Sequence, residues 1–322
     1  MIIFLYGPDT FRSRRLLHEM KDKFIKDADQ EGDSLGIVDG QNATISEINE
    51  KINTGSLFTK KRMVIIEGIF KNKKTTIFAE LLGILQKVES DDEKVIIIRE
   101  SELGTKEASL KADAKKLFNY LLKQKYVQEF KFLKDNSLLS FIKKEAALYE
   151  KDISTQAATE IVKRTGGDLW LATQGIKKAA LASNEKMISL ELIKEMTTET
   201  FSEDIFSLTD ALGARNKKLA LKILEEQYLA GASDEYLIAM LTRQFKILLQ
   251  LSEAQTNKLS PDKIALDLKM HPFVVKKGLA QARNFTSAQL LSYLNLLLKF
   301  DFANKTGGSD IKTELTLLIA GI

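Results

Sequence analysis

The residues near the amino terminus that could do chemistry lie in the segment Tyr6-Gly-Pro-Asp-Thr-Phe-Arg-Ser-Arg14. An apolar run precedes this segment and a helical pattern follows it, as around the phosphate-binding loop of an α/β nucleotide-binding domain. When GxxxxGK[ST] is counted from Gly7, however, Arg12 replaces the second glycine. Ser13 replaces the lysine, and Arg14 replaces the hydroxyl residue that holds magnesium. We therefore interpret the segment as a strand-to-helix turn without nucleotide chemistry.

Acids, histidines and cysteines do not supply another active site. The apolar run Met63-Val-Ile-Ile66 ends in the single acid Glu67, whereas a Walker B strand ends in an Asp-Glu pair that binds magnesium and polarises water. The chain has no Cys and only two His, His18 and His271, for which we expect surface or capping roles. Disulfides and thiolate chemistry are excluded, and no metal or cofactor is expected.

Leu57 and Phe58 are a signal of a different kind, because two large apolar residues follow a glycine in a connection between expected strands. Two interpretations are open from the residues alone. The pair could be buried in the core of its own domain, or it could be an exposed plug for an apolar pocket on a partner. The basic stretch from Lys60 to Lys74 would steer such a plug towards an acidic protein surface or DNA.

The elements that must position these residues follow an α/β pattern over about the first 135 residues, in which short β-branched runs alternate with helical spacing. The continuous apolarity of the third and fourth runs indicates a five-stranded parallel sheet with both faces covered. The expected strands are 2–6, 35–38, 63–67, 95–99 and 126–130, and the expected helices are 12–24, 44–53, 76–87 and 109–123.

Beyond about residue 136 the strand signal disappears. Ser or Asp opens each of four short helical segments, 137–149, 154–165, 168–183 and 189–196, and longer helices follow from Ile205. We predict an α/β domain over residues 1–136, a small helical domain over 137–203 and a larger helical domain over 204–322.

Composition predicts a soluble intracellular protein. Of 322 residues, 44% are hydrophobic, 29% are charged and only 3 are Pro, which excludes disorder. No apolar run reaches the roughly 18 to 20 residues of a membrane helix, and the first residues lack the basic leader of a signal peptide. The net charge of +4 falls short of that of a dedicated DNA-binding domain, so we expect weak, salt-sensitive DNA binding by the isolated chain.

As a whole, the sequence resembles the delta subunits of the bacterial DNA polymerase III clamp loader over essentially its full length. The resemblance rests on the order and spacing of seven segments. They are Phe4-Leu-Tyr-Gly-Pro-Asp9, Gly55-Ser-Leu-Phe-Thr-Lys-Lys-Arg62, Gly166-Gly-Asp-Leu-Trp170, Phe206-Ser-Leu-Thr-Asp-Ala-Leu212, Leu241-Thr-Arg-Gln-Phe245, His271-Pro-Phe273 and Leu296 to Asp301.

This resemblance implies an AAA+-like module, made of the α/β domain and a small helical lid domain, followed by a helical collar domain for oligomerisation. It implies a cytoplasmic accessory subunit without intrinsic catalysis that opens the ring-shaped sliding clamp for loading onto primed DNA. Leu57 and Phe58 match the family's apolar pair that enters the hydrophobic pocket of the clamp. The implied partners are the sliding clamp (beta subunit), the motor subunits (gamma and tau), delta prime and primed DNA. We expect the isolated chain to be monomeric.

Three alternatives stay open. A divergent active AAA+ ATPase would need ATP binding, against which the missing Lys and Ser/Thr of the phosphate loop argue. A delta prime subunit would carry a Ser-Arg-Cys arginine finger, and this chain has no Cys. A non-replicative AAA+-like adaptor would bind an unrelated partner through its helical domains, and only binding data separate it from a clamp-binding subunit.

Overall fold

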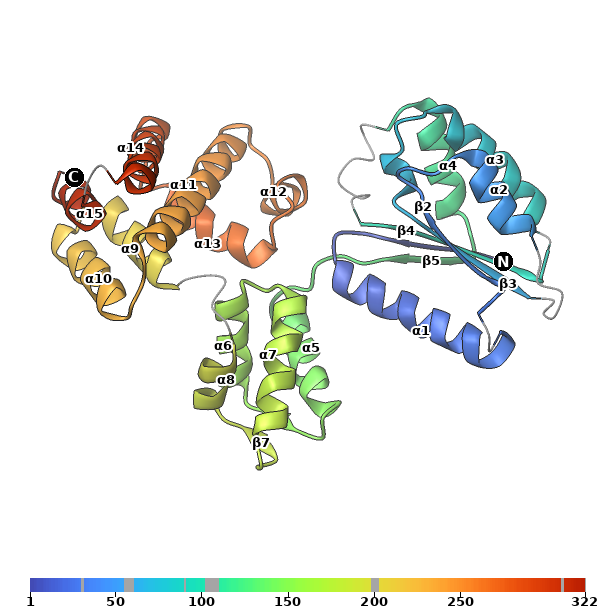
Figure 1. The fold of residues 1–322 in the computed structure, drawn as a ribbon, viewed down its shortest axis with the longest axis horizontal. Coiled ribbons are helices and arrows are strands. Elements are labelled where there is room, and N and C mark those ends of the chain that lie inside the picture. The colour runs from blue at the N-terminus through green and yellow to red at the C-terminus, as the bar shows by residue number, and fades with distance from the viewer. Residues whose placement is uncertain are drawn as a thin grey trace. The chain divides into compact units, whose positions relative to one another are not determined.

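The computed structural model describes residues 1–29, 32–54, 61–89, 91–101, 110–197, 203–307 and 310–321. It divides the chain into two compact units, Met1–Leu133 and Lys134–Ile322. Figure 1 shows the elements of each unit.

The first unit contains a parallel sheet of five strands in the order β2-β3-β4-β1-β5 (Figure 1). Each neighbouring pair of strands is parallel, and β1 lies between β4 and β5. The five predicted strands are confirmed, with small shifts at their ends. Their bounds are β1 Ile2–Tyr6, β2 Leu35–Asp39, β3 Arg62–Glu67, β4 Lys94–Glu100 and β5 Tyr126–Glu129.

Helices cover both faces of this sheet, which explains why its central strands are apolar at successive positions. One face packs against α1 (Thr10–Ala28), and the other against α2 (Ile45–Asn53), α3 (Thr76–Val88) and α4 (Ala112–Leu122) (Figure 1). Alternate residues of β1 therefore enter different cores: Phe4 packs in the core of α2 to α4, and Leu5 packs in the core of α1. A short 3-10 helix, η1 (Ile69–Lys71), follows β3.

The second unit begins with the four predicted short helices, and a side chain caps three of them. Ser154, Asp168 and Ser189 accept backbone N–H groups at the starts of α6, α7 and α8. The prediction that no strand follows residue 136 is wrong, because β6 (Asp152–Ile153) and β7 (Met187–Ile188) form a small parallel sheet. Two-residue strands are too short to give a periodic pattern. The helices are α5 Asp135–Ala147, α6 Thr155–Thr165, α7 Leu169–Ala182 and α8 Leu190–Met196.

The longer helices that follow pack around α11, whose Leu241, Phe245 and Leu248 are buried. A polar contact crosses this core: Gln244 donates to the side-chain oxygen of Gln281 at 2.5 Å. The boundaries of the three predicted domains stay a prediction. The bounds are α9 Glu203–Gly213, α10 Lys217–Leu229, α11 Asp234–Thr256, α12 Pro261–Asp267, α13 Pro272–Ala282, α14 Ser287–Thr306 and α15 Ile311–Ala320. Among the described residues, no helix has both the length and the apolarity to cross a membrane.

The turn after β1 depends on a glycine, and this dependence can be measured. Gly7 has a φ of 125°, and a Cβ there would lie 2.5 Å from the carbonyl oxygen of Phe130. Gly68 also has a positive φ, 74°, with open space around the site of its Cβ. We expect Gly7→Ala to destabilise the first unit by about 2 to 4 kcal/mol, against about 1 kcal/mol for Gly68→Ala. Hydrogen exchange of the β1 and β4 amides measures both costs, and equal costs would contradict the close contact.

Candidate functional site

The two residues predicted to bind a partner, Leu57 and Phe58, lie outside the described residues. The chain on either side of them is described. Helix α2 ends at Asn53, and β3 begins at Arg62. The connection that carries the pair therefore enters β3 at the edge of the sheet where the parallel strands begin.

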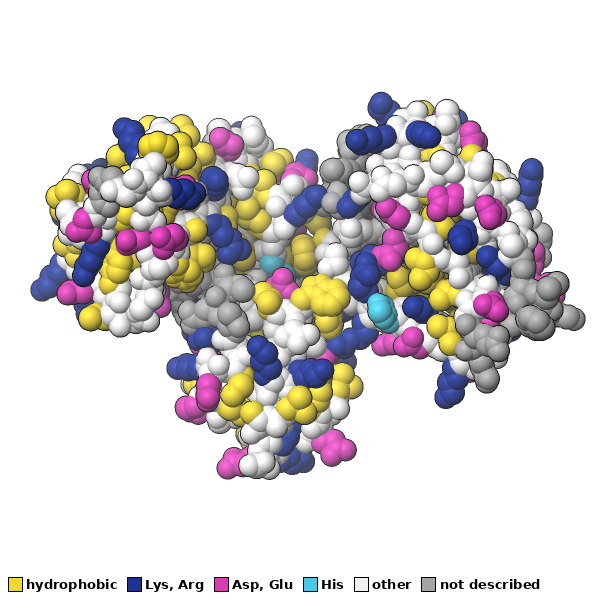
Figure 2. Space-filling model, viewed as in Figure 1, with side chains coloured by type: hydrophobic (Ala, Val, Ile, Leu, Met, Phe, Trp, Pro, Cys, Tyr) yellow, Lys and Arg dark blue, Asp and Glu magenta, His cyan; other side chains and the backbone are white. Residues whose placement is uncertain are grey.

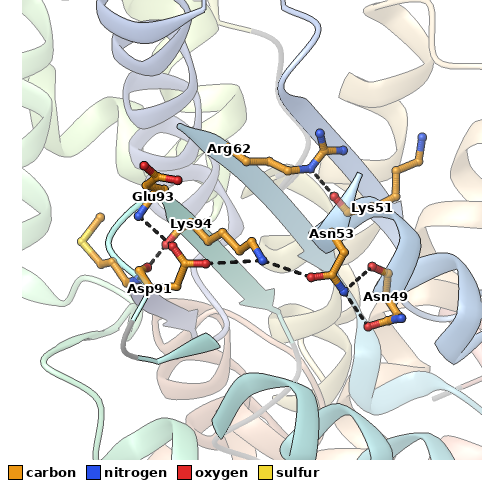
Figure 3. A network of polar contacts seen from close by, with 8 residues as sticks. Asn49, Lys51, Asn53, Arg62, Asp91, Glu93 and Lys94 are labelled. Carbon is orange, nitrogen blue, oxygen red and sulfur yellow. Dashed lines mark hydrogen bonds and ion pairs between the residues drawn. The ribbon is translucent and has the colours of Figure 1, made fainter. Parts of the chain in front are cut away.

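A network of polar contacts holds the end of α2 on the near side of this connection (Figure 3). The side-chain amide of Asn53 donates to the carbonyl oxygen of Asn49 at 3.0 Å and to its Oδ1 at 2.8 Å. Lys94, the first residue of β4, donates to Oδ1 of Asn53 at 3.0 Å and lies 3.4 Å from the carboxylate of Asp91. The last turn of α2 is thus tied to the turn before β4.

Arg62 holds the far side of the connection through the same turn. Its guanidinium donates to the carbonyl of Lys51, and its backbone N–H donates to the carbonyl of Glu93 at 2.8 Å (Figure 3). Burial lowers the pKa of the Arg62 guanidinium, and the charge of Asp29 opposes this shift. Both flanks of residues 55–60 are therefore fixed to residues 91–94, which sets where the connection leaves and rejoins the fold.

At the opposite edge, where the strands end, the turn after β1 is closed by contacts within the chain. Asp9 caps α1: its carboxylate accepts the backbone N–H of Arg12 at 3.0 Å and the Nε–H of Arg12 at 2.6 Å. The backbone N–H of Gly7 donates to the backbone carbonyl oxygen of Glu100 at 3.0 Å, and that of Asp9 donates to the backbone carbonyl oxygen of Phe130 at 3.0 Å. This geometry agrees with a strand-to-helix turn and not with a loop whose N–H groups face a phosphate.

Ion pairs occupy the positions that correspond to the catalytic residues of a nucleotide site. Glu67, at the end of β3, accepts from Arg99 at 2.5 Å and from Arg14 at 3.0 Å. Ser13, at the position of the phosphate-loop lysine, is fully buried, and its hydroxyl accepts Nε–H of Arg99 at 3.3 Å. The sequence did not predict these pairs, because Arg14 and Arg99 lie far from Glu67 along the chain and only the sheet brings them together.

The two histidines lie at a helix start and on a helix surface. His271 caps α13, since its Nδ1 accepts the backbone N–H of Phe273 at 3.2 Å, and His18 is exposed on α1. The predicted capping and surface roles are confirmed. A search of the described ranges finds no group of three or more His, Cys, Asp or Glu side chains that could hold a metal ion.

The surface charge is mixed and not gathered into one basic face in the view of Figure 2. Lys and Arg side chains alternate with Asp and Glu side chains over both units in this view. Such mixing agrees with the small net charge of +4. It favours weak contacts with phosphates over tight DNA binding by the chain alone.

A buried acid beside the turn after β1 makes the stability of the first unit depend on pH. Glu100 is 1% exposed, and burial raises the pKa of its carboxyl to about 7. Hydrogen bonding from the backbone N–H of Phe70, at 3.1 Å, and the charges of Lys71 and Arg99 oppose this shift. Since the pKa is raised on folding, the carboxyl stabilises the fold fully below pH 4.5, and this contribution is lost as the pH rises through about 7.

We expect Glu100→Gln to stabilise the first unit at pH 8, by up to about 3 kcal/mol, and to change little at pH 4. Glutamine stays neutral and can still accept the N–H of Phe70. Urea denaturation followed by circular dichroism at the two pH values measures the difference. If Glu100→Gln changed the free energy of unfolding equally at pH 4 and pH 8, ionisation of Glu100 would not be what lowers the stability at high pH.

Comparison with known proteins supports the resemblance over nearly the whole chain. Residues 202–322 match the family model described as DNA polymerase III delta subunit, C-terminal domain. The chain is 22% identical over 320 residues to DNA polymerase III subunit delta of Bacillus subtilis (strain 168), which covers 98% of this chain and 90% of the relative. The solved structure of the Bacillus subtilis DNA clamp loader delta protein matches with a TM-score of 0.77 at 24% identity, covering 99% of this chain and 94% of that one. The structural likeness confirms the predicted fold class, and the comparisons together confirm that this chain resembles the DNA polymerase III delta subunit.

Proposed function

We propose that this chain is the delta subunit of a DNA polymerase III clamp loader, which binds the sliding clamp and opens its ring for loading onto primed DNA. The observation that carries the proposal is the match to a DNA polymerase III delta subunit along 98% of the chain. The family model over residues 202–322 supports it independently of the first unit.

An accessory role without ATP hydrolysis is supported by the edge of the sheet where the strands end. Glu67 is paired with Arg14 and Arg99, and Ser13 is buried where a phosphate-binding lysine would have to reach solvent. A nucleotide would have to displace these ion pairs and would find no lysine to bind its terminal phosphates. Hydrolysis of ATP then belongs to other subunits of the complex.

Leu57 and Phe58 are the proposed contact with the clamp. Two adjacent apolar side chains inserted into an apolar pocket contribute about 2 kcal/mol or more each when they are fully buried. The contacts of Asn53 and Arg62 support this role, because they fix both flanks of the connection. A connection held at both ends loses less conformational entropy on binding than a free loop.

Ring opening follows from differential affinity. A closed clamp is held together at its subunit interfaces, and a partner that binds the open form more tightly shifts the equilibrium only by the ratio of the two affinities. In this scheme, the motor subunits bind ATP and expose the surface around Leu57 and Phe58. Hydrolysis releases that surface and leaves the clamp closed on DNA.

Membership of a clamp loader complex follows from the delta resemblance, and the individual partners are part of the proposal. They are the sliding clamp (beta subunit), the motor subunits (gamma and tau), delta prime and primed DNA. The helices of residues 204–322 serve as the collar through which the complex assembles in the cytoplasm, and the isolated chain is monomeric. Basic residues contact the DNA backbone inside the assembled complex without reading bases.

The first test replaces the proposed contact. Leu57→Ala with Phe58→Ala should weaken binding to the sliding clamp of the same organism by about a thousandfold, because two buried side chains of about 2 kcal/mol each are lost. Calorimetry without ATP measures the affinity. The folded state is checked by circular dichroism, and assembly with the other loader subunits by gel filtration.

A matched control replaces two exposed apolar residues elsewhere in the first unit. Ile37→Ala with Tyr126→Ala removes side chains that are 54% and 44% exposed, and it should leave clamp affinity unchanged. If the Leu57 and Phe58 variant unfolds, the pair belongs to the core. If the wild-type chain does not bind the clamp, the chain is an AAA+-like adaptor with another partner.

A second test concerns the network at the base of the connection. Lys94→Met removes the bond to Asn53 and keeps the apolar part of the side chain, so we expect clamp binding about fivefold weaker, the value of one lost hydrogen bond. Lys94→Arg should restore most of the affinity. Lys87→Met, which makes the same charge change at an exposed position of α3, is the control. If Lys94→Met and Lys87→Met lost the same affinity for the clamp, the loss would come from the change in net charge and not from the bond to Asn53.

A further inference from the structure

The second unit contains a cleft of about 970 Å³ that the clamp-binding proposal does not use. Helices α5 and α6 form one wall, and α12 and α13 form the other. Its inner surface is mostly apolar, and cationic side chains lie at its rim. The apolar residues are Leu138, Leu139, Val162, Pro261, Pro272, Phe273, Leu279 and Ala280.

Two contacts join the walls of this cleft. The Cβ of any other residue at Gly167 would lie 2.3 Å from the imidazole of His271, which places the turn after α6 directly against the start of α13. Lys134 forms an ion pair of 2.5 Å with Asp262 and joins the start of α5 to α12. Two segments singled out in the sequence, Gly166-Gly-Asp168 and His271-Pro-Phe273, therefore meet beside the cleft.

Two of the cations that line this cleft are Lys276 of α13 and Arg283, the residue that directly follows this helix. Lys276 and Arg283 are exposed, and neither forms an ion pair with another residue of the described ranges. They lie seven residues apart, which is two helical turns or about 10 Å, and small Ala280 lies between them on the same face. Of the two acids that line the cleft, Asp262 is already paired with Lys134, and only Asp135 opposes the cations.

We propose that this cleft binds a small organic anion with an apolar body and an acidic group at each end. Its volume lies within the range of small-molecule sites, about 300 to 1,000 Å³, and its apolar walls suit an apolar body. The spacing of Lys276 and Arg283 suits acidic groups about 10 Å apart. A nucleic acid strand fits less well, because only His271 and Phe273 among the lining residues carry a ring on which bases could stack, and Nδ1 of His271 already caps α13. The proposal is independent of clamp binding.

The probe is bis-ANS, an aromatic disulfonate whose fluorescence rises in apolar surroundings. Titrated into the full chain, it should bind with one equivalent per chain. Lys276→Glu with Arg283→Glu should weaken that binding about tenfold, because two attractions become repulsions. Ala280→Trp, which keeps both cations and fills the space between them from an exposed position, should abolish it.

The matched control is Lys218→Glu with Lys299→Glu, which makes the same change in net charge at exposed positions on α10 and α14. Its affinity for bis-ANS should stay within about twofold of the wild type. Circular dichroism verifies that every variant is folded. The proposal is overturned if wild-type chain shows no saturable site, if the control loses as much affinity as the rim variant, or if Ala280→Trp binds like the wild type.

Discussion

Strands β1 and β4 impose the constraint on which the first unit depends, because parallel strands buried on both faces need a paired neighbour on each side and helices above and below. The pairing of β1 with β4 and β5, and of β4 with β3, satisfies the first need. Helix α1 on one face and α2 to α4 on the other satisfy the second (Figure 1). The two edges of the sheet, where strands begin and end, are then the places left for function.

The two edges of the sheet differ in what their side chains do. Where the strands end, the fold keeps the outline of a nucleotide-binding domain, but Glu67 is paired with both Arg14 and Arg99, and Asp9 caps α1. Charges that would otherwise be open to a phosphate or a metal are thus paired within the chain. Where the strands begin, Asn53, Lys94 and Arg62 fix a connection that carries two large apolar residues. The proposed clamp contact and the end of the sheet where a nucleotide site would lie are therefore separated by the full length of a strand.

In the second unit, polar side chains within an apolar core specify how the helices pack. Gln281 accepts from Gln244 and donates to the hydroxyl of Thr209 at 2.9 Å, which links α13, α11 and α9. Buried amides are costly unless their partners are in place, so such a cluster favours one arrangement of the helices over others of similar apolar contact.

The local sequence pattern by itself determined the order of the helices and strands and the absence of a phosphate-loop motif after the first strand. Strand and helix periods gave the order of elements, Ser and Asp marked helix starts, and the substitutions at Arg12, Ser13 and Arg14 already excluded a phosphate loop. These signals depend on neighbours within a few residues. The partners of Glu67, the tie between Asn53 and Lys94, the contact of Gly167 with His271 and the strands β6 and β7 were decided only by the tertiary structure. Each joins residues at least 30 positions apart, and such distant pairs leave no periodic trace in a single sequence.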